Sequence, residues 1–380
     1  PQTLGLVINR KDPLSREIGE YYRLTHNLPA ENVIEIDLPV QAGISAQQFA
    51  GAYDQLKQNT AEHIQAYGLA FWQPYKVDCL SMTTAVTFGV DKRFCASGCR
   101  STRYSAYFNS SSSAPWNDHQ LRPSMAIAAR SLTQAKRLID RGKSSRQSWP
   151  DHASGFVMKT SDKARSVRGI AETDLKRLNR FDNLEVIQEK GNELRGVRDL
   201  MFYFTGLSRV PSLERNIYLP GAVADHLTSY GGVLDGTGQM SAIEWLEGGA
   251  TGSYGTVVEP CNFTAKFPNP TILMDNYQRG DTLVEAYWKS VAMPGQGIFI
   301  GDPLARPWGG YQLKQDGEWL TIESHRFQPG NYVILSAANA DGPFHKLGTA
   351  TLTPDDLSIS LKPPSNSGFL RVDRLMRTVH

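Results

Sequence analysis

Cys261 is the residue of this 380-residue chain whose neighbours best suit nucleophilic chemistry. Small residues and then the β-branched run Thr256-Val257-Val258 lead into Glu259-Pro260-Cys261, which predicts a strand over 253–258 that ends just before the thiol. A thiol needs a base to react near neutral pH, because only a small fraction of an ordinary cysteine is thiolate there. His226 lies in a strand-like segment upstream and is the candidate general base, with Asp225 or Glu259 beside the pair.

The cysteines also allow a structural interpretation. The chain holds four, Cys79, Cys95, Cys99 and Cys261, and an even number fits two disulfides. Cys95 and Cys99 flank a short segment that contains a glycine, which favours a small disulfide loop. Cys261 would then pair with Cys79 or lie buried. Cys79 and His119 do not complete a usual zinc spacing with the other two thiols, so we expect no metal.

Four further residues are candidates for substrate binding. Thr228 and Ser229 end a predicted strand before Gly231-Gly232, where backbone amides could face a ligand. The alternative is a turn in which the glycines supply positive φ. Trp72 and Tyr75 follow another predicted strand and could stack on a peptide or a glycan, although core packing is the more common role of such side chains.

The composition excludes several classes of protein. Forty basic and 38 acidic residues give a net charge of +2, which is not that of a nucleic-acid binder. No apolar run is long enough to span a membrane. Phosphate-binding glycine loops and the Gly-x-Ser-x-Gly elbow are missing, so we expect no cofactor. The sequence leaves the oligomeric state open.

Alternating strand and helix patterns predict a doubly wound, mainly parallel α/β sheet. The expected strands and helices alternate from the start of the chain: strand 4–9, a helix from Asp12-Pro13, strand 33–38, helix 45–66 and strand 68–72. Residues 73–124 hold three cysteines and are predicted as a long loop insertion after the third strand. Such sheets place their sites at the carboxyl ends of strands.

The rest of this domain, predicted to cover 1–310, continues the pattern. The expected strands are 156–158, 184–187, 200–204, 223–229 and 253–258, and the expected helices are 124–141, 164–180 (basic and exposed), 239–247 and 282–291. Short alternating runs with Asp-Gly and Pro-Gly turns follow, and they predict a small β-sandwich over 311–380.

Several motifs are similar to those of a family of uncharacterised bacterial proteins that are predicted to be exported. They are Asp12-Pro13-Leu14-Ser15, Pro74 to Cys79, Arg122 to Met125, and much of 220–308. The resemblance implies a periplasmic or extracellular location, and the cysteine count agrees with it. No signal peptide is visible, and the chain begins at Pro1.

A fainter similarity is to gingipain-type cysteine peptidases and the caspase-like fold. Cys261 falls where the nucleophile would be, and Gly301-Asp302-Pro303-Leu304 resembles the segment that closes the catalytic domain. Those peptidases have Gly directly after the catalytic His, whereas Leu227 follows His226. The resemblance implies an exported cysteine hydrolase. The alternative is a non-catalytic exported binding or envelope-assembly protein on the same fold, with disulfides Cys95–Cys99 and Cys79–Cys261.

Overall fold

The protein consists of two compact units. The computed structural model describes residues 1–96, 99–180, 183–353, 356–363 and 368–375. Unit 1 comprises Pro1–Tyr277 and Asp281–Pro307, and unit 2 comprises Gln278–Gly280 and Trp308–His380. Each unit has its own strands and its own hydrophobic core.

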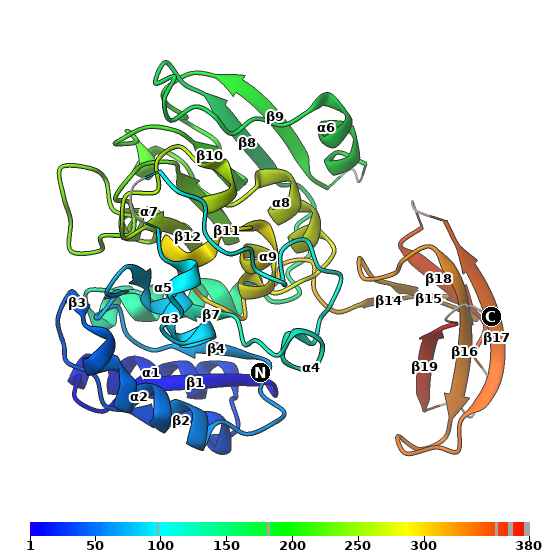
Figure 1. Ribbon diagram of the computed structural model, residues 1–380. Coiled ribbons are helices and arrows are strands. Elements are labelled where there is room, and N and C mark those ends of the chain that lie inside the picture. Colours follow the sequence, from blue (N-terminus) through cyan, green and yellow to red (C-terminus); the bar gives the residue numbers. More distant parts are fainter. Residues whose placement is uncertain (97–98, 181–182, 354–355, 364–367, 376–380) are drawn as a thin grey trace. The chain divides into compact units, whose positions relative to one another are not determined.

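A ten-stranded sheet forms the centre of unit 1 (Figure 1). Its strands are β1 (Leu4–Asn9), β2 (Val33–Ile36), β4 (Ala66–Leu69), β7 (Ser124–Ala126), β8 (Ser154–Lys159), β9 (Glu185–Lys190), β10 (Leu200–Thr205), β11 (Tyr218–His226), β12 (Gly252–Thr256) and β13 (Gly297–Gly301). Their order across the sheet is β2-β1-β4-β7-β13-β12-β11-β10-β8-β9. Neighbours are parallel except for β12 and β13. The predicted mainly parallel α/β sheet is confirmed.

The antiparallel pair β12 and β13 divides the sheet into two halves. The first half, β2-β1-β4-β7-β13, runs in one direction, and the second half, β12-β11-β10-β8-β9, runs in the other. In Figure 1 the first half is mostly blue and the second mostly green. The carboxyl ends of the two halves therefore lie at opposite ends of the strands, an arrangement that the sequence patterns do not reveal. Each such row of strand ends is called an edge of the sheet below.

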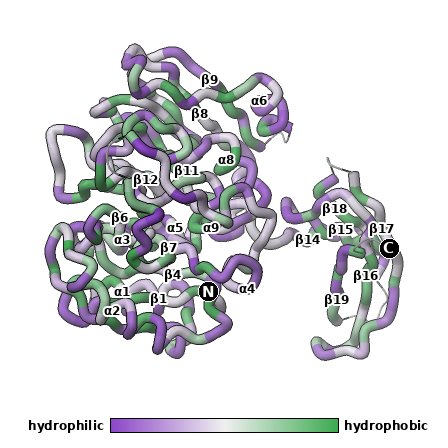
Figure 2. Tube along the Cα trace, in the orientation of Figure 1, coloured by the Kyte–Doolittle hydropathy of each residue, from purple (hydrophilic) through white to green (hydrophobic). Residues whose placement is uncertain are grey.

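Helices cover both faces of this sheet. They are α1 (Pro13–His26), α2 (Ala46–Asn59), α3 (Met82–Phe88), α4 (Pro115–His119), α5 (Leu132–Ser145), α6 (Glu172–Leu178), α7 (Ile243–Gly248), α8 (Pro270–Gln278) and α9 (Leu283–Ser290). Right-handed crossovers lead from β1 outward to β2 and then back to β4, so α1 and α2 lie on opposite faces. Helix α1 packs against α5. Figure 2 shows α6 as mainly hydrophilic, in keeping with its sequence.

Local signals explain the ends of several helices. Asp12 caps α1 by accepting a hydrogen bond from the backbone of Leu14, and Asn27 ends the helix in the left-handed conformation. Ser45 and Gln48 form a capping box at the start of α2. The boundaries differ from the predictions elsewhere: α2 ends at Asn59 because β4 follows it, and α6 is much shorter than 164–180.

The predicted helix over 124–141 begins too early. Ser124–Ala126 is strand β7, paired with β4, and Ser131 then caps α5 by accepting from the backbone of Gln134. Helices α3 and α8 and strand β13 were not predicted. Each is short and largely apolar, so periodicity alone does not identify it.

The segment 73–123 is a crossover rather than a loose insertion. It joins β4 to β7, which are parallel neighbours, and such neighbours require a long connection. The crossover contains β5 (Lys76–Val77), β6 (Leu80–Ser81), α3, the 3₁₀ turn η2 (Lys92–Phe94) and α4. Strands β5 and β6 form a small sheet with β3 (Gly43–Ile44). Because β7 starts at the edge where β12 ends, the crossover must return to that edge.

Unit 2 is a small β-sandwich. One sheet contains β14 (Gln312–Asp316), β15 (Trp319–Glu323) and β18 (Ser358–Leu361), and the other contains β16 (Gly330–Ala337), β17 (His345–Leu352) and β19 (Phe369–Arg374). All pairs are antiparallel. Side chains from both sheets share one core, including Ile322, Tyr332, Ile334, Leu352, Ile359 and Leu361. The predicted β-sandwich fold is confirmed.

Candidate functional site

Most of the predicted site residues lie at the carboxyl edge of the second half. Asp225 and His226 end β11, and Thr228 and Ser229 follow them. Glu259 and Cys261 follow β12, a parallel neighbour of β11, so these residues share one edge.

The two predicted aromatic residues are placed differently. Trp72 follows β4, whose carboxyl end faces the opposite edge. The Tyr75 hydroxyl donates a hydrogen bond of 2.5 Å to Asp235 Oδ1. Burial and this hydrogen bond raise the pKa of Tyr75. Because the hydrogen bond ties Tyr75 to the loop after β11, Tyr75 does not share a site with Cys261.

The disulfides are Cys79–Cys95 and Cys99–Cys261, with Cα–Cα distances of 5.5 and 5.4 Å. The expected pairs Cys95–Cys99 and Cys79–Cys261 are therefore wrong. The crossover folds back on itself, which brings Cys79 to Cys95. Its return to the edge where β12 ends brings Cys99 to Cys261. No cysteine is free, so Cys261 has no thiol to ionise in this structure.

Glu259 fixes the backbone at Cys261 rather than polarising a thiol. The backbone N–H of Cys261 donates to Glu259 Oε1 over 2.8 Å, and Cys261 has φ of 54°. The backbone carbonyl of Glu259 accepts a hydrogen bond of 2.6 Å from Gln296. A non-glycine residue takes this left-handed conformation only where its surroundings impose it, and here the carboxylate and the disulfide do so.

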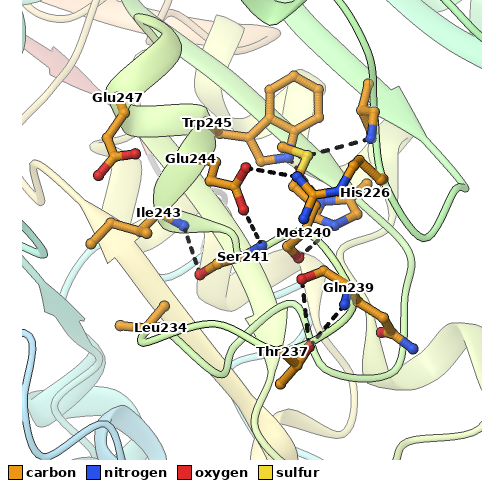
Figure 3. A network of polar contacts seen from close by, with 12 residues as sticks. His226, Leu234, Thr237, Gln239, Met240, Ser241, Ile243, Glu244, Trp245 and Glu247 are labelled. Carbon is orange, nitrogen blue, oxygen red and sulfur yellow. Dashed lines mark hydrogen bonds and ion pairs between the residues drawn. The ribbon is translucent and has the colours of Figure 1, made fainter.

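His226 is buried, and both of its ring nitrogens are engaged (Figure 3). The indole N–H of Trp245 donates to Nδ1 over 2.9 Å, so the ring proton lies on Nε2 and faces the carbonyl of Met240 at 3.1 Å. Burial is the main reason that the pKa of His226 falls to about 3. The neutral ring has no free lone pair, so His226 does not offer a general base in this arrangement.

Asp225 is the counter-ion of Arg168. Arg168 Nη1 lies 2.5 Å from Asp225 Oδ1, and both side chains are almost fully buried. Burial raises the pKa of Asp225, while the guanidinium opposes that rise. Arg168 also donates to the carbonyl of Thr205, at the end of β10, over 2.8 Å. The expectation of an exposed basic helix through Arg168 is wrong, because the residue precedes α6 and turns inward.

Thr228 and Ser229 hold a turn together. Thr228 Oγ1 accepts from Arg165 Nε at 3.1 Å and donates to Gln239 at 2.8 Å. The Thr256 hydroxyl donates to the carbonyl of Ser229 at 2.9 Å. The Thr228 hydroxyl is thus committed to protein partners, and the loop it anchors is the one that leads to Met240 and Trp245.

The second glycine after this turn, Gly232, is needed for close approach. Neither Gly231 nor Gly232 has positive φ, contrary to one of the two interpretations above. A Cβ at Gly232 would instead lie 2.6 Å from the carbonyl oxygen of Gly255 in β12. The turn after β11 therefore packs its backbone directly on β12.

A cleft of about 340 Å³ lies beside Arg168. Its walls come from the crossover (Tyr104 and Phe108), from Val167 and Arg168, and from the loop that contains Phe267. Arg168 Nε is buried and has no hydrogen-bond partner among the described residues, an unusual state for a buried donor. These residues were not predicted, since nothing in the sequence near them indicates that they meet.

The described ranges contain neither a metal-ligating cluster nor a helix that could cross a membrane. No cluster of three or more His, Cys, Asp and Glu residues could hold a metal ion among them. No helix of that part of the chain has the length and apolar character needed to cross a membrane.

Comparison with known proteins gives structural neighbours. No family model and no curated protein matches the chain. The crystal structure of the Arg-specific cysteine proteinase gingipain R is 11% identical, covers 95% of this chain and 92% of its own, and has a TM-score of 0.45. The complex of the pro- and mature domains of Porphyromonas gingivalis RgpB is 10% identical, with coverage of 97% and 98% and a TM-score of 0.40. A third structure, described as a protease, is 11% identical with a TM-score of 0.42. These similarities are too distant to assign an activity to this chain.

Proposed function

We propose that this protein is a non-catalytic binding protein of an oxidising compartment outside the cytoplasm. The observation that carries the proposal is the Cys99–Cys261 disulfide, which leaves the best-placed nucleophile without a thiol. The hydrogen bonds of His226 support the proposal as well. Both ring nitrogens already have partners, so the expected base has no free lone pair to offer. Disulfides form and persist mainly in the periplasm and outside cells, and this chain has all four cysteines paired.

The proposed ligand is a peptide segment bound in the cleft beside Arg168. The cleft has the size of small binding sites, and its lining combines aromatic and apolar side chains with the polar residues Thr264, Asn269 and Ser290. Aromatic side chains beside hydrogen-bonding groups suit a peptide segment, which offers apolar side chains and backbone polar groups together. The unpartnered N–H of Arg168 is the donor that a peptide carbonyl oxygen would satisfy.

A cysteine hydrolase is the second candidate, favoured by the left-handed backbone that holds Cys261 at the end of β12. It requires reduction of the disulfide and a base other than His226. Hydrolysis of fluorescein-labelled casein and alkylation by iodoacetamide, each measured before and after treatment with dithiothreitol, separate the two candidates. We expect no alkylation of the oxidised protein and no hydrolysis in either state. Hydrolysis that appears on reduction and disappears in Cys261→Ala would overturn the proposal.

Binding is tested with peptides from a tryptic digest of casein, passed over the immobilised full chain and identified by mass spectrometry. Val167→Asp places a charge on the wall of the cleft and should abolish retention. Val40→Asp is the matched control, because Val40 is also an exposed valine and does not line the cleft. Equal retention by both variants and the unchanged protein would contradict peptide binding in this cleft.

A further inference from the structure

A second and larger pocket lies in unit 1, and neither Cys261 nor His226 lines it. Its volume is about 500 Å³, within the usual range for small-molecule sites. Helix α2, the end of α3, strand β4 and three further stretches of the crossover, 91–94, 103–106 and 116–122, form its walls. It shares Tyr104 with the cleft beside Arg168, and no other lining residue. We call it the arginine pocket.

Positive charge exceeds negative charge in the lining of the arginine pocket. The lining holds Lys57, Arg93, Arg103 and Arg122 but one carboxylate, that of Asp91. Lys57 is paired with Asp54, outside the lining, at 2.9 Å, so the three arginines carry the surplus. Arg93 binds Asp91 at 2.6 Å, and Arg103 lies 3.7 Å from the same oxygen. The hydrogen bond from Arg93 is the main reason that the pKa of Asp91 is lowered. One carboxylate thus serves two guanidinium groups, and the lining keeps a surplus of cations.

Arg122 is the cation with the least compensation. Its guanidinium carbon lies 3.5 Å from the centroid of the Trp116 ring, and its Nε donates to the carbonyl of Ile64 over 2.7 Å. Within the described residues no carboxylate lies at ion-pair distance from it, and burial lowers its pKa. A partly buried guanidinium stacked on an aromatic ring is already desolvated and oriented, which favours an incoming anion.

Aromatic side chains contribute to the remaining walls. Tyr53, Tyr67, Phe88 and Phe94 line the pocket together with Trp116, and the rings of Phe88 and Phe94 stack with centroids 4.2 Å apart. Such walls bind flat apolar groups.

We propose that the arginine pocket binds a small anion that carries a planar ring, with its carboxylate or phosphate group balancing the surplus guanidinium charge. This site is separate from the proposed peptide cleft, and either can exist without the other. The proposal requires no catalytic group in the pocket, and the expected event is reversible binding.

Isothermal titration calorimetry of the full-length oxidised protein tests this proposal with three probes: benzoate, phenyl phosphate and benzyl alcohol. At least one anion should bind, and its affinity should fall as NaCl is raised from low to moderate concentration. The uncharged alcohol should bind far more weakly. A preference for benzoate identifies carboxylate ligands, and a preference for phenyl phosphate identifies phosphate esters. Binding of neither anion, or equal binding of the alcohol, would overturn the proposal.

Variants locate the binding. Arg122→Met should weaken the anion about tenfold or more, since hydrogen bonds to charged groups are worth this much. Arg103→Met provides a second test at a more exposed position and should weaken binding in the same direction. Arg195→Met is the matched control, an exposed arginine outside the pocket. Val167→Asp should leave anion binding unchanged, which separates this site from the peptide cleft. An equal loss in Arg195→Met would contradict the assignment.

Discussion

Removal of the Cys99–Cys261 disulfide should destabilise the protein more than removal of Cys79–Cys95. The two pairs close loops of very different size, with sequence separations of 162 and 16. The loop-closure relation gives a loss in the free energy of unfolding of about 5 kcal/mol for the long loop and about 3 kcal/mol for the short one. The loops do not overlap in the sequence, so the two effects should be close to additive.

Alanine is the replacement of choice at all four positions. Ala at 261 keeps the strain of a non-glycine residue at positive φ, and the backbone N–H can still donate to Glu259. The double variant Cys79→Ala/Cys95→Ala is the matched control for Cys99→Ala/Cys261→Ala. A difference in the free energy of unfolding between the two double variants therefore reports the size of the loop that each disulfide closes and not the loss of sulfur as such.

Urea titration followed by tryptophan fluorescence measures these losses. Five of the seven tryptophans belong to unit 1, so the signal reports mainly on the unit that contains both disulfides. The unfolding midpoints should fall in the order unchanged protein, short-loop variant, long-loop variant. Equal midpoints for the two variants, or the reverse order, would refute the reasoning from loop length.

Two further predictions concern the edge where the candidate site lies. The pKa of His226 is about 3 in the folded protein against 6.5 for an ordinary histidine, so the unfolded chain binds a proton that the folded chain does not. This contribution to stability is complete above pH 6.5 and is lost as the pH falls toward 3, by roughly 5 kcal/mol. In His226→Gln, acid unfolding followed by circular dichroism should depend less on pH over this range, and an unchanged pH dependence would contradict the assignment. Gly255→Ala should cost about 3 kcal/mol or more, since its Cβ would lie 2.3 Å from the backbone of Gly231. Gly51→Ala, on the open surface of α2, should instead stabilise by roughly 0.5–1 kcal/mol, and thermal unfolding that ranks the two variants otherwise would count against the packing argument.

The alternation of strands and helices was predictable because its signals are local. The run 4–8 is apolar and ends at the polar Asn9, and Asp12-Pro13 marks a helix start by the chemistry of its side chains. The reversal between β12 and β13 was not predictable, because Gly297–Gly301 is a short apolar strand whose direction depends on distant partners. The sequence pattern for a buried strand is the same in either direction.

The candidate site was predictable only in its location. Adjacent parallel strands place Asp225 and Cys261 at one edge, and both strand ends were predicted to within three residues. The state of each side chain depends on residues far away in the sequence. Trp245 determines the tautomer of His226, and Arg168 neutralises Asp225. Four cysteines allow three pairings, and no spacing rule selects among them.

The reversal of strand direction also affects how the chain is completed during synthesis. Strand β7 pairs with β13 through Ala126 and Ile300, and the whole second half is translated between them. At ordinary translation rates this interval is on the order of ten to thirty seconds. During that time β7 is an outer strand with one side unpaired, which can pair with other chains. Cys99 likewise has no Cys261 with which to form its disulfide. Strand β13 pairs with β7 on one side and β12 on the other, so neither half of the sheet is complete until residues 297–301 are in place.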